Sequence, residues 1–394
     1  MPTNFSTSIF GTQALVDDLF VTADSFRQGN LWAWGRNYEG QLGNNRTTGF
    51  SSNPTPVTTF AGGANWKQVS GGYSSTVAIK TDGTLWVWGS NFQGNLGDNT
   101  TTNRCTPVTT FAGGNNWKQV AGGGAFIASI KTDGTLWTWG RNVNGPLGVN
   151  DTNSRTTPVT TFAGGTNWKQ VACGYLYTLA IKTDGTLWTW GVNFFGQLGD
   201  NTTTNRSTPV TTFAGGTNWK QVAGGGQGSC AVAIKTDGTL WTWGYNNHGQ
   251  LGLNDTTTRT TPVTTFAGGT NWKQVAGGGY STAAIKTDGT LWAWGYNVNG
   301  RLGDNTTTDR LTPVTTFAGG TNWKQVACGN NYTAAIKTDG TLWTWGANSY
   351  GRLGDNTTTS RSTPVTTFAG GTNWKQVGGG QLHTTATTYI DDYQ

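Results

Sequence analysis

The side chains that most often carry chemistry are scarce in this sequence. It contains two histidines, His248 and His383, and a single glutamate, Glu39. Neither histidine belongs to a pattern typical of a catalytic triad or a metal cluster, and one glutamate makes a catalytic carboxylate pair implausible. A loop aspartate recurs in four places but is Asn, Val or Leu elsewhere, which disfavours a repeated calcium site. We therefore expect no enzymatic activity, no cofactor and no metal.

The abundant chemistry is aromatic, and it is periodic. Leu-Trp-X-Trp-Gly occurs seven times, with first tryptophans at Trp32, Trp86, Trp137, Trp188, Trp241, Trp292 and Trp343. Asn-Trp-Lys-Gln-Val also occurs seven times, at Trp66, Trp117, Trp168, Trp219, Trp272, Trp323 and Trp374. Three tryptophans in each of seven repeats account for all 21 in the chain. Every tryptophan is therefore a repeat element, and we expect most of them to pack neighbouring repeats together.

Each repeat of about 51 residues predicts four short strands. In sequence order these are NWKQVA, TAAIK, TLWTWG and TPVTTF, with a Thr-Asp-Gly turn between the second and the third. Asp-Gly is typical of tight hairpin turns, and Gly, Thr, Val and Trp suit short strands better than helices. Four strands at this period are typical of a propeller blade. We predict an all-β, seven-bladed propeller over residues 30–394.

The two ends of the chain predict how the ring closes. The repeats start at Leu31 without the strand that normally precedes LWAWG, and they finish at His383–Ile390 without the LWTWG that normally follows. The simplest closure pairs residues 31–35 with 384–390, which removes exposed sheet edges. Residues 1–29 lie outside the ring as an N-terminal arm, either a candidate docking segment or a loosely packed terminus.

The four cysteines are predicted to be free thiols. They are Cys105, Cys173, Cys230 and Cys328, and none has a disulfide or metal-ligand spacing. Cys173 and Cys328 occupy the same repeat position in blades that are not neighbours, too far apart to bridge. Free thiols indicate a reducing compartment. The N-terminus shows no secretory signal, and no apolar run predicts membrane insertion, so we expect a cytoplasmic or virion-associated protein.

The repeat resembles that of the regulator of chromosome condensation family. The resemblance lies in Gly-Gly-Tyr73, in Ala-Ile-Lys-Thr-Asp82-Gly-Thr-Leu-Trp86-Val-Trp88-Gly89 and in Gln41-Leu42-Gly43, and it covers residues 31–390. It implies a seven-bladed propeller closed by both termini. The near-identical copies are similar to those of bacterial or phage-type members.

That family includes a GTPase nucleotide exchange factor, a plant ultraviolet photoreceptor and a bacterial β-lactamase inhibitor. The exchange factor works through a wedge between strands, whereas the largest insertion here is three residues, near Arg46–Pro54. The photoreceptor carries Gly-Trp-Arg-His at the position of Tyr73. The matching positions here hold no Trp: Tyr73, Gly124, Tyr175, Gly226, Gly279, Asn330 and Gln381. The sequence therefore disfavours both activities.

The seven copies differ from one another in two patches, after QVAGG and after LWTWG. Because the second and third strands form one hairpin, both patches are expected on one face of the disc, opposite the nearly invariant TDG and FAGGTN turns. The varied face is rich in aromatic residues, which suit recognition surfaces. Its candidate ligand-binding residues are Tyr38, Phe92, Phe126, Tyr175, Tyr177, Phe194, Phe195, Tyr245, Tyr280, Tyr296, Tyr332 and Tyr350.

The same face is expected to carry one arginine in each long loop except the first. These are Arg104, Arg155, Arg206, Arg259, Arg310 and Arg361. Six guanidinium groups could bind carboxylated or sulphated sugars, or they could pair with loop carbonyls and loop aspartates. The net charge of +6 is spread through the repeats rather than gathered in a run, and no nucleic-acid partner is expected.

We interpret the sequence as a non-enzymatic recognition propeller that binds a glycan or a protein through the aromatic face, with display on a virion or cell surface as one setting. Drift in unconstrained loops is the alternative origin of that face. A structural or decoration subunit of a larger particle, attached through residues 1–29 or the invariant face, is the second hypothesis. A GTPase regulator is a third and disfavoured one.

Overall fold

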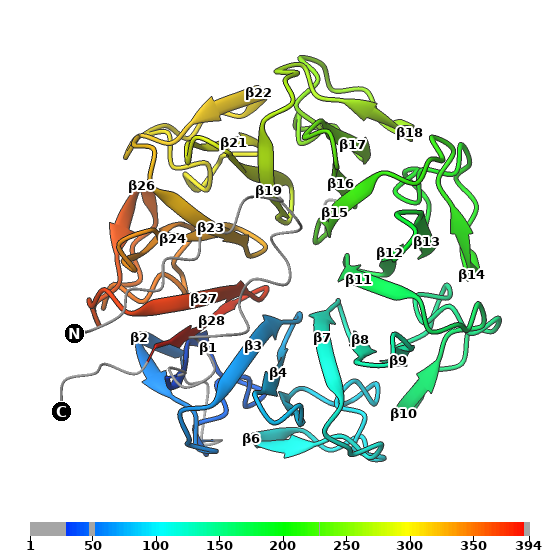
Figure 1. Cartoon of the computed structure of the whole chain (residues 1–394). Helices are drawn as coiled ribbons and strands as arrows, with labels where there is room; N and C mark the ends of the chain where they lie inside the picture. Colours follow the sequence, from blue (N-terminus) through cyan, green and yellow to red (C-terminus); the bar gives the residue numbers. More distant parts are fainter. Residues whose placement is uncertain (1–28, 47–51, 228, 390–394) are drawn as a thin grey trace, which may run out of the picture.

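Seven four-stranded antiparallel sheets stand around a central channel as the blades of a propeller (Figure 1). The computed structural model describes residues 29–46, 52–227 and 229–389, and every regular element within these ranges is a β-strand. The predicted seven-bladed, all-β fold is confirmed. The predicted N-terminal arm lies outside the described residues, apart from Gly29. No helix in the described ranges is long and apolar enough to cross a bilayer.

The inner two strands of each blade come from NWKQVA and TAAIK. The innermost strands line the channel and are β3 (Trp66–Gly71), β7 (Trp117–Gly122), β11 (Trp168–Cys173), β15 (Trp219–Gly224), β19 (Trp272–Gly277), β23 (Trp323–Cys328) and β27 (Trp374–Gly379). The second strands are β4 (Ser75–Lys80), β8 (Phe126–Lys131), β12 (Tyr177–Lys182), β16 (Cys230–Lys235), β20 (Ser281–Lys286), β24 (Tyr332–Lys337) and β28 (His383–Thr388).

The outer two strands come from LWTWG and TPVT. The third strands are β1 (Leu31–Arg36), β5 (Leu85–Gly89), β9 (Leu136–Gly140), β13 (Leu187–Gly191), β17 (Leu240–Gly244), β21 (Leu291–Gly295) and β25 (Leu342–Gly346). The outermost strands are β2 (Ser52–Thr58), β6 (Arg104–Thr109), β10 (Arg155–Thr160), β14 (Arg206–Thr211), β18 (Arg259–Thr264), β22 (Arg310–Thr315) and β26 (Arg361–Thr366). Blades 1 to 6 are numbered in chain order from β3–β6 to β23–β26.

Blade 7 closes the ring with two strands from each end of the described chain, in the order β2-β1-β28-β27. In the pairing of β1 with β28, Leu31 lies opposite Thr387 and Gly35 opposite His383. This is the predicted closure. Because no covalent link joins β1 to β28, the seam depends on this pairing and on the core around Ala386.

Tryptophans fill one side of each blade interface. In blade 1, Trp66 makes edge contacts with both Trp86 and Trp88, at ring-centroid distances of 6.4 and 6.2 Å. Ala78 on the intervening strand is small enough to leave room for these rings. The opposite face of each blade is aliphatic and packs against the tryptophans of the next blade, as Val77, Ile79 and Leu85 do against Trp117 and Trp139. The repeated tryptophans therefore build the core, as expected.

A belt of glutamine side chains joins the innermost strands around the channel. Gln119 accepts a hydrogen bond from Val171 N and donates to Val171 O, each at 3.0 Å, so its amide replaces a neighbouring backbone strand. The same bridge recurs between blades, and Val69 N donates to Gln376 Oε1 at 3.2 Å between blades 1 and 7. The sequence pattern marked NWKQVA only as a strand and did not reveal this belt.

Replacement of Gln119 by Leu is expected to lower the free energy of unfolding by about 2 kcal/mol, because it leaves two backbone groups of Val171 unpaired. Lys118→Leu, at the exposed neighbouring position, is the control and should change stability by less than about 0.5 kcal/mol. Urea unfolding followed by tryptophan fluorescence measures both. Equal effects of the two substitutions would contradict the role assigned to the glutamine belt.

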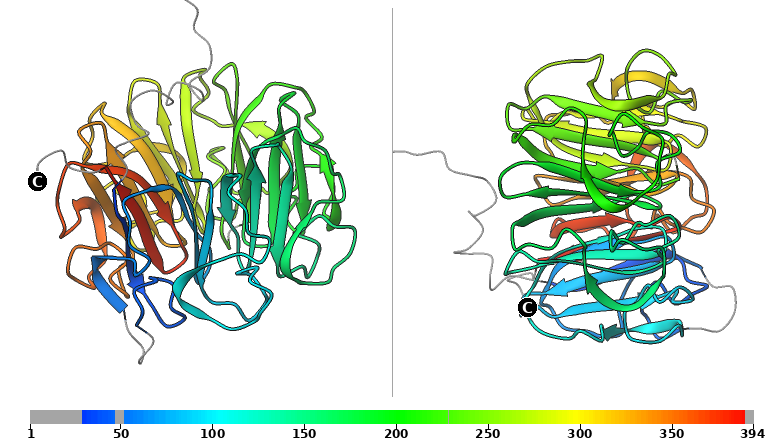
Figure 2. Two further views of the ribbon diagram at one scale, coloured as in Figure 1. Left: turned by 60° about the horizontal axis from the view of Figure 1, so that its bottom comes forward. Right: turned by 90° about the vertical axis from the view of Figure 1, so that its right-hand side faces the viewer.

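The two faces of the disc differ as expected. Ser75 pairs with Gly89, so the start of β4 and the end of β5 lie at the same end of blade 1, and the register repeats in the other blades. We call this end the variable face. The TDG turns and FAGGTN connectors meet at the other end, the invariant face, where Trp117 N donates to Gly83 O. Figure 2 shows the ring from two further directions.

Candidate functional site

Three of the predicted ligand-binding aromatics are core residues. Phe126, Tyr177 and Tyr332 begin the second strand of their blades and are at most 1% exposed. A glycine three residues before each ring leaves space for it; a Cβ on Gly174 would lie 2.0 Å from Tyr177 Cε1. The Tyr177 hydroxyl accepts from Gly225 N, and the Tyr332 hydroxyl donates to His383 O at 2.6 Å. The two tyrosine hydroxyls bind neighbouring backbone. All three rings are buried, so they do not contribute to the exposed surface.

Five other rings form a continuous aromatic belt on the variable face, from blade 3 to blade 5. Phe195 contacts Tyr245 at 4.6 Å between centroids, and His248 contacts Tyr296 at 4.4 Å. Tyr280 lies between them, within 6.4 Å of Tyr245 and 5.7 Å of His248. The sequence placed four of these residues in the candidate site and did not include His248.

Buried arginines support the aromatic clusters from below. Arg301 lies over the ring of Tyr296 at 4.5 Å and donates to Asn331 Oδ1 at 2.8 Å. Burial lowers the pKa of Arg301 to about 10, so it stays charged at neutral pH. Arg352 takes the same position beside Tyr350, which in turn contacts Tyr38 at 6.0 Å. The positive charge of each arginine is attracted to the electron-rich face of the ring that it contacts.

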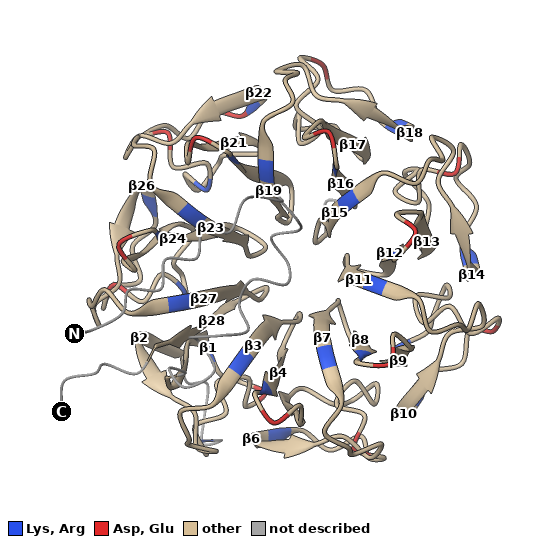
Figure 3. Ribbon diagram, in the orientation of Figure 1, with Lys and Arg blue, Asp and Glu red and all other residues tan. Residues whose placement is uncertain are grey.

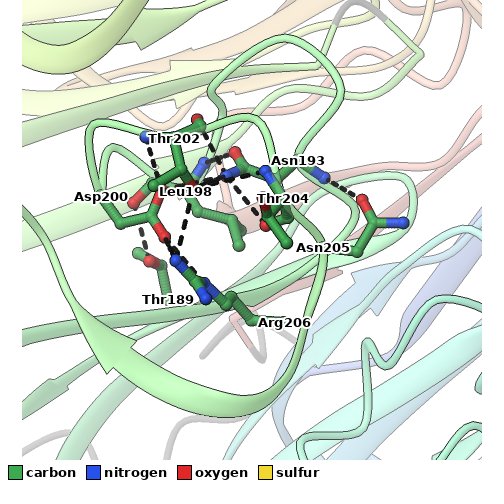
Figure 4. Close-up of polar contacts among 8 residues, drawn as sticks. All are labelled: Thr189, Asn193, Leu198, Asp200, Thr202, Thr204, Asn205 and Arg206. Carbon is green, nitrogen blue, oxygen red and sulfur yellow. Dashed lines mark hydrogen bonds and ion pairs between the residues drawn. The ribbon is translucent and has the colours of Figure 1, made fainter.

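The predicted arginine rim is paired within its own loops. In blade 3, Arg206 binds Asp200 at 2.8 Å, and Asn193 donates to Asp200 and to the carbonyl of Thr202 (Figure 4). Burial alone would raise the pKa of Asp200, but the hydrogen bonds from Thr202, Arg206 and Asn193 hold it below its ordinary value. The other five arginines are also paired with loop aspartates. The sequence left two roles open for these arginines, sugar binding and pairing within the loops. In the structure they pair with loop aspartates.

A cleft of about 210 Å³ opens on the variable face between blades 1 and 2. Three aromatic rings line it: Tyr73, Tyr175 and Phe92. Tyr73 and Tyr175 contact each other at 5.8 Å, and Phe92 is 65% exposed. Arg141 from blade 2 also lines the cleft. The cleft therefore brings together stacking surfaces and a cation.

Two residues that line the same cleft each carry a buried polar atom without a hydrogen-bond partner among the described residues. These atoms are Ser90 Oγ and Asn95 Oδ1, in side chains that are 3% and 2% exposed. A buried polar atom without a partner carries a desolvation cost that a ligand with matching donors would relieve. Phe92 and Tyr175 were in the predicted site, whereas Tyr73, Ser90, Asn95 and Arg141 were not.

One position in the repeat helps to explain why the cleft opens here. Three other blades carry glutamine where blade 1 carries Asn95, and each glutamine Oε1 accepts from the backbone N–H two residues earlier. Asn95 is one methylene shorter, and its amide donates instead to Ser90 O. Across the cleft, Gly124 and Ala125 replace the larger Tyr-Ser pair of blade 1. Comparing the copies at this position could have identified the cleft from sequence.

The cleft adjoins the mouth of the central channel, because Tyr73, Gly124 and Tyr175 line both. The mouth encloses about 100 Å³ and is lined mainly by glycine backbone. Cys173 and Cys328 also line it, and the four cysteines are free, as predicted. Burial raises the pKa of Cys173 and raises that of Cys328 to about 12, so neither supplies a thiolate at neutral pH.

Seven near-identical four-stranded blades, closed by strands from both ends and carrying varied loops on one face only, define a repeat propeller. The sequence model of the RCC1-like domain matches residues 19–318 and 164–391, and the chain belongs to this family. The predicted family is thereby confirmed. The relatives described below are eukaryotic, so the bacterial or phage-type resemblance is not supported.

Among curated proteins, the chain is similar to the ultraviolet-B receptor UVR8 of Arabidopsis thaliana, with 32% identity over 340 residues, covering 84% of this chain and 76% of the receptor. It is 28% identical to human E3 ubiquitin-protein ligase HERC2 over 94% of this chain, but spans only 8% of that protein. Among solved structures, Prp20p of Saccharomyces cerevisiae superposes with a TM-score of 0.80 at 20% identity, covering 93% of each chain. Human WBSCR16 gives 0.78 at 23% identity, covering 92% of this chain and 99% of that structure.

Proposed function

We propose that the chain is a non-enzymatic binding propeller whose ligand is an acidic glycan held in the cleft between blades 1 and 2. The observation that carries this proposal is the convergence on one cavity of Tyr73, Tyr175, Arg141 and the two buried polar atoms of Ser90 and Asn95. Aromatic rings stack on the apolar faces of sugars, and a guanidinium pairs with a carboxylate. The cleft is smaller than the roughly 300–1,000 Å³ typical of drug-sized ligands, which suits a single sugar unit.

The polar atoms supply the remaining specificity. Asn95 Oδ1 can only accept a hydrogen bond, and the Ser90 hydroxyl can donate or accept. A sugar hydroxyl group can satisfy either atom. Arg141 differs from the rim arginines because no described residue forms an ion pair with it, whereas Arg206 is held by Asp200. Arg141 is therefore the cation available to a carboxylate.

Titration calorimetry with a galacturonic acid tetramer, and with a neutral galactose tetramer of equal length, tests this assignment. Arg141→Gln is expected to weaken binding of the acidic tetramer about tenfold and to leave the neutral one unchanged. Arg206→Gln is the matched control, and it should leave both affinities unaltered. If Arg206→Gln loses the preference for the acidic tetramer while Arg141→Gln keeps it, the ligand binds at the arginine rim and not in the cleft.

A protein ligand is the second candidate, and the aromatic belt favours it. Phe194 and Phe195, at 61% and 40% exposure, add apolar surface to the variable face at the belt. Prp20p, which shares the fold, binds Gsp1p and histones. A protein that uses the belt should lose affinity in a Phe194→Ser, Phe195→Ser variant and keep it in a Tyr73→Ala, Tyr175→Ala variant. The glycan proposal predicts the reverse.

A further inference from the structure

The invariant face carries a ring of exposed phenylalanines that the variable face does not explain. One follows the outermost strand of every blade, in the first position of the connector, and each is between 64% and 67% exposed. The seven are Phe60, Phe111, Phe162, Phe213, Phe266, Phe317 and Phe368. A single exposed apolar residue needs no explanation, but an equivalent one in all seven blades forms a repeated apolar surface.

The connectors hold these rings in a fixed geometry. In blade 1, Phe111 N donates to Gly97 O at 2.8 Å, and Gly113 N closes a turn on Thr110 O at 3.0 Å. Trp117 Nε1 then donates to Gly113 O at 2.9 Å, which ties the connector to the next blade. The phenyl rings are therefore presented to solvent on an ordered backbone, so little conformational entropy would be lost when they are covered.

Lysines surround the channel on the same face. Each innermost strand carries one as its second residue (Figure 3): Lys67, Lys118, Lys169, Lys220, Lys273, Lys324 and Lys375. The six remaining lysines end the second strands, as Lys80 does beside Asp82 at the TDG turn. Each of these six lysines has an aspartate of a TDG turn as its counterpart. The charges at these turns offset each other, so the positive excess of the face comes from the innermost-strand lysines, two of which, Lys324 and Lys375, lie over the ring of Tyr389.

We propose that the invariant face adsorbs to an anionic lipid bilayer, with the phenylalanines at the level of the headgroups and the lysines facing the anionic lipid. Seven equivalent apolar contacts on a circle can be made at once only by a surface that is planar and continuous, which is how a bilayer presents itself. A second copy of the chain would oppose one positive ring to another. A linear polyanion could follow only an arc of the ring. This inference does not depend on the ligand of the variable face.

Vesicle sedimentation tests the proposal with the full chain. The wild type is expected to sediment with vesicles of mixed phosphatidylserine and phosphatidylcholine, and not with pure phosphatidylcholine. Phe111→Ser, Phe162→Ser and Phe213→Ser together should weaken that binding at least about tenfold. The matched control is Phe92→Ser with Phe194→Ser, which removes equally exposed rings from the variable face and should leave vesicle binding unchanged.

The charge contribution is tested separately. Lys118→Gln, Lys220→Gln and Lys273→Gln should weaken binding, as should raising the salt from about 0.1 to about 1 M, which shortens the Debye length from roughly 10 to 3 Å. Circular dichroism establishes that every variant is folded. Absence of wild-type binding to anionic vesicles overturns the proposal. So does equal binding by the triple phenylalanine variant, or retention only of single-stranded nucleic acid in a parallel filter assay.

Discussion

Ala386→Asp is expected to destabilise the propeller by about 4 kcal/mol, the largest effect of any single substitution considered. Ala386 is fully buried in β28, opposite Trp32 on one side and Val377 on the other. It packs in a cluster with Trp34 and Trp374. A carboxylate there would be buried among these rings away from water, and it would weaken the blade that contains strands from both ends of the described chain.

The repeats supply the control for this prediction. Ser129 occupies the equivalent position in blade 2, where its hydroxyl donates to Gln119 O at 2.7 Å. Ala386→Ser can make the same bond to Gln376 O and should change stability by less than about 1 kcal/mol. Urea unfolding compares the two variants with the wild type. If Ala386→Asp is close to the wild type in stability, the seam does not hold the ring together.

The second large effect is a loss of stability on acidification that originates at His383. Burial, with a further contribution from the charge of Arg36, lowers the pKa of His383 from 6.5 to about 4. His383 Nε2 lies 2.9 Å from Thr76 Oγ1, which donates its own proton to Gln41 O. We infer that Nε2 carries the proton and that Nδ1, buried without a partner among the described residues, does not.

The sign follows from the depressed pKa. Between pH 6.5 and about 4 the unfolded chain binds a proton at His383 and the folded chain does not, so the free energy of unfolding falls as the pH falls. Over that window the loss is about 3 kcal/mol. The loop aspartates, whose pKa values are lowered below 3.8, add to the loss only at more acidic pH.

His383→Phe should remove this pH dependence, because phenylalanine has no titratable group. The ring should fit, since Phe126 fills the equivalent buried position in blade 2. Thr76 keeps its bond to Gln41 O in that variant. Unfolding free energies measured across the window should be nearly flat for the variant and sloped for the wild type. An unchanged slope in His383→Phe would refute the assignment.

The fold could be predicted from sequence because each repeat marks where its strands end and its turns lie. Asp-Gly turns, paired tryptophans and the interrupted repeats at each end determine strand order and closure, and the structure agrees in each. The glutamine belt could not be predicted, because it depends on the distance between innermost strands of neighbouring blades. An amide side chain in a strand gives no sign of whether it faces solvent or bridges to another backbone.

The candidate site was predictable only in outline. The variable face follows from strand direction, but aromatic residue type alone does not separate Phe126 and Tyr177, whose rings each fill the space beside a glycine, from Phe92, which lies at the cleft. Asn95 is a small departure from glutamine whose effect becomes visible only when the neighbouring Gly124 and Ala125 are placed beside it. The phenylalanines of the invariant face were not predicted as a site, because a connector that is the same in every repeat is expected to have a structural role.

An array of acidic and neutral glycans tests whether the cleft between blades 1 and 2 is the recognition site. Wild-type protein and a Tyr73→Ala, Tyr175→Ala variant are applied to it side by side. We expect the wild type to bind carboxylated glycans and the variant, with its fold intact by circular dichroism, not to bind them. Binding of neither protein to any glycan, or equal binding by both, would contradict this expectation.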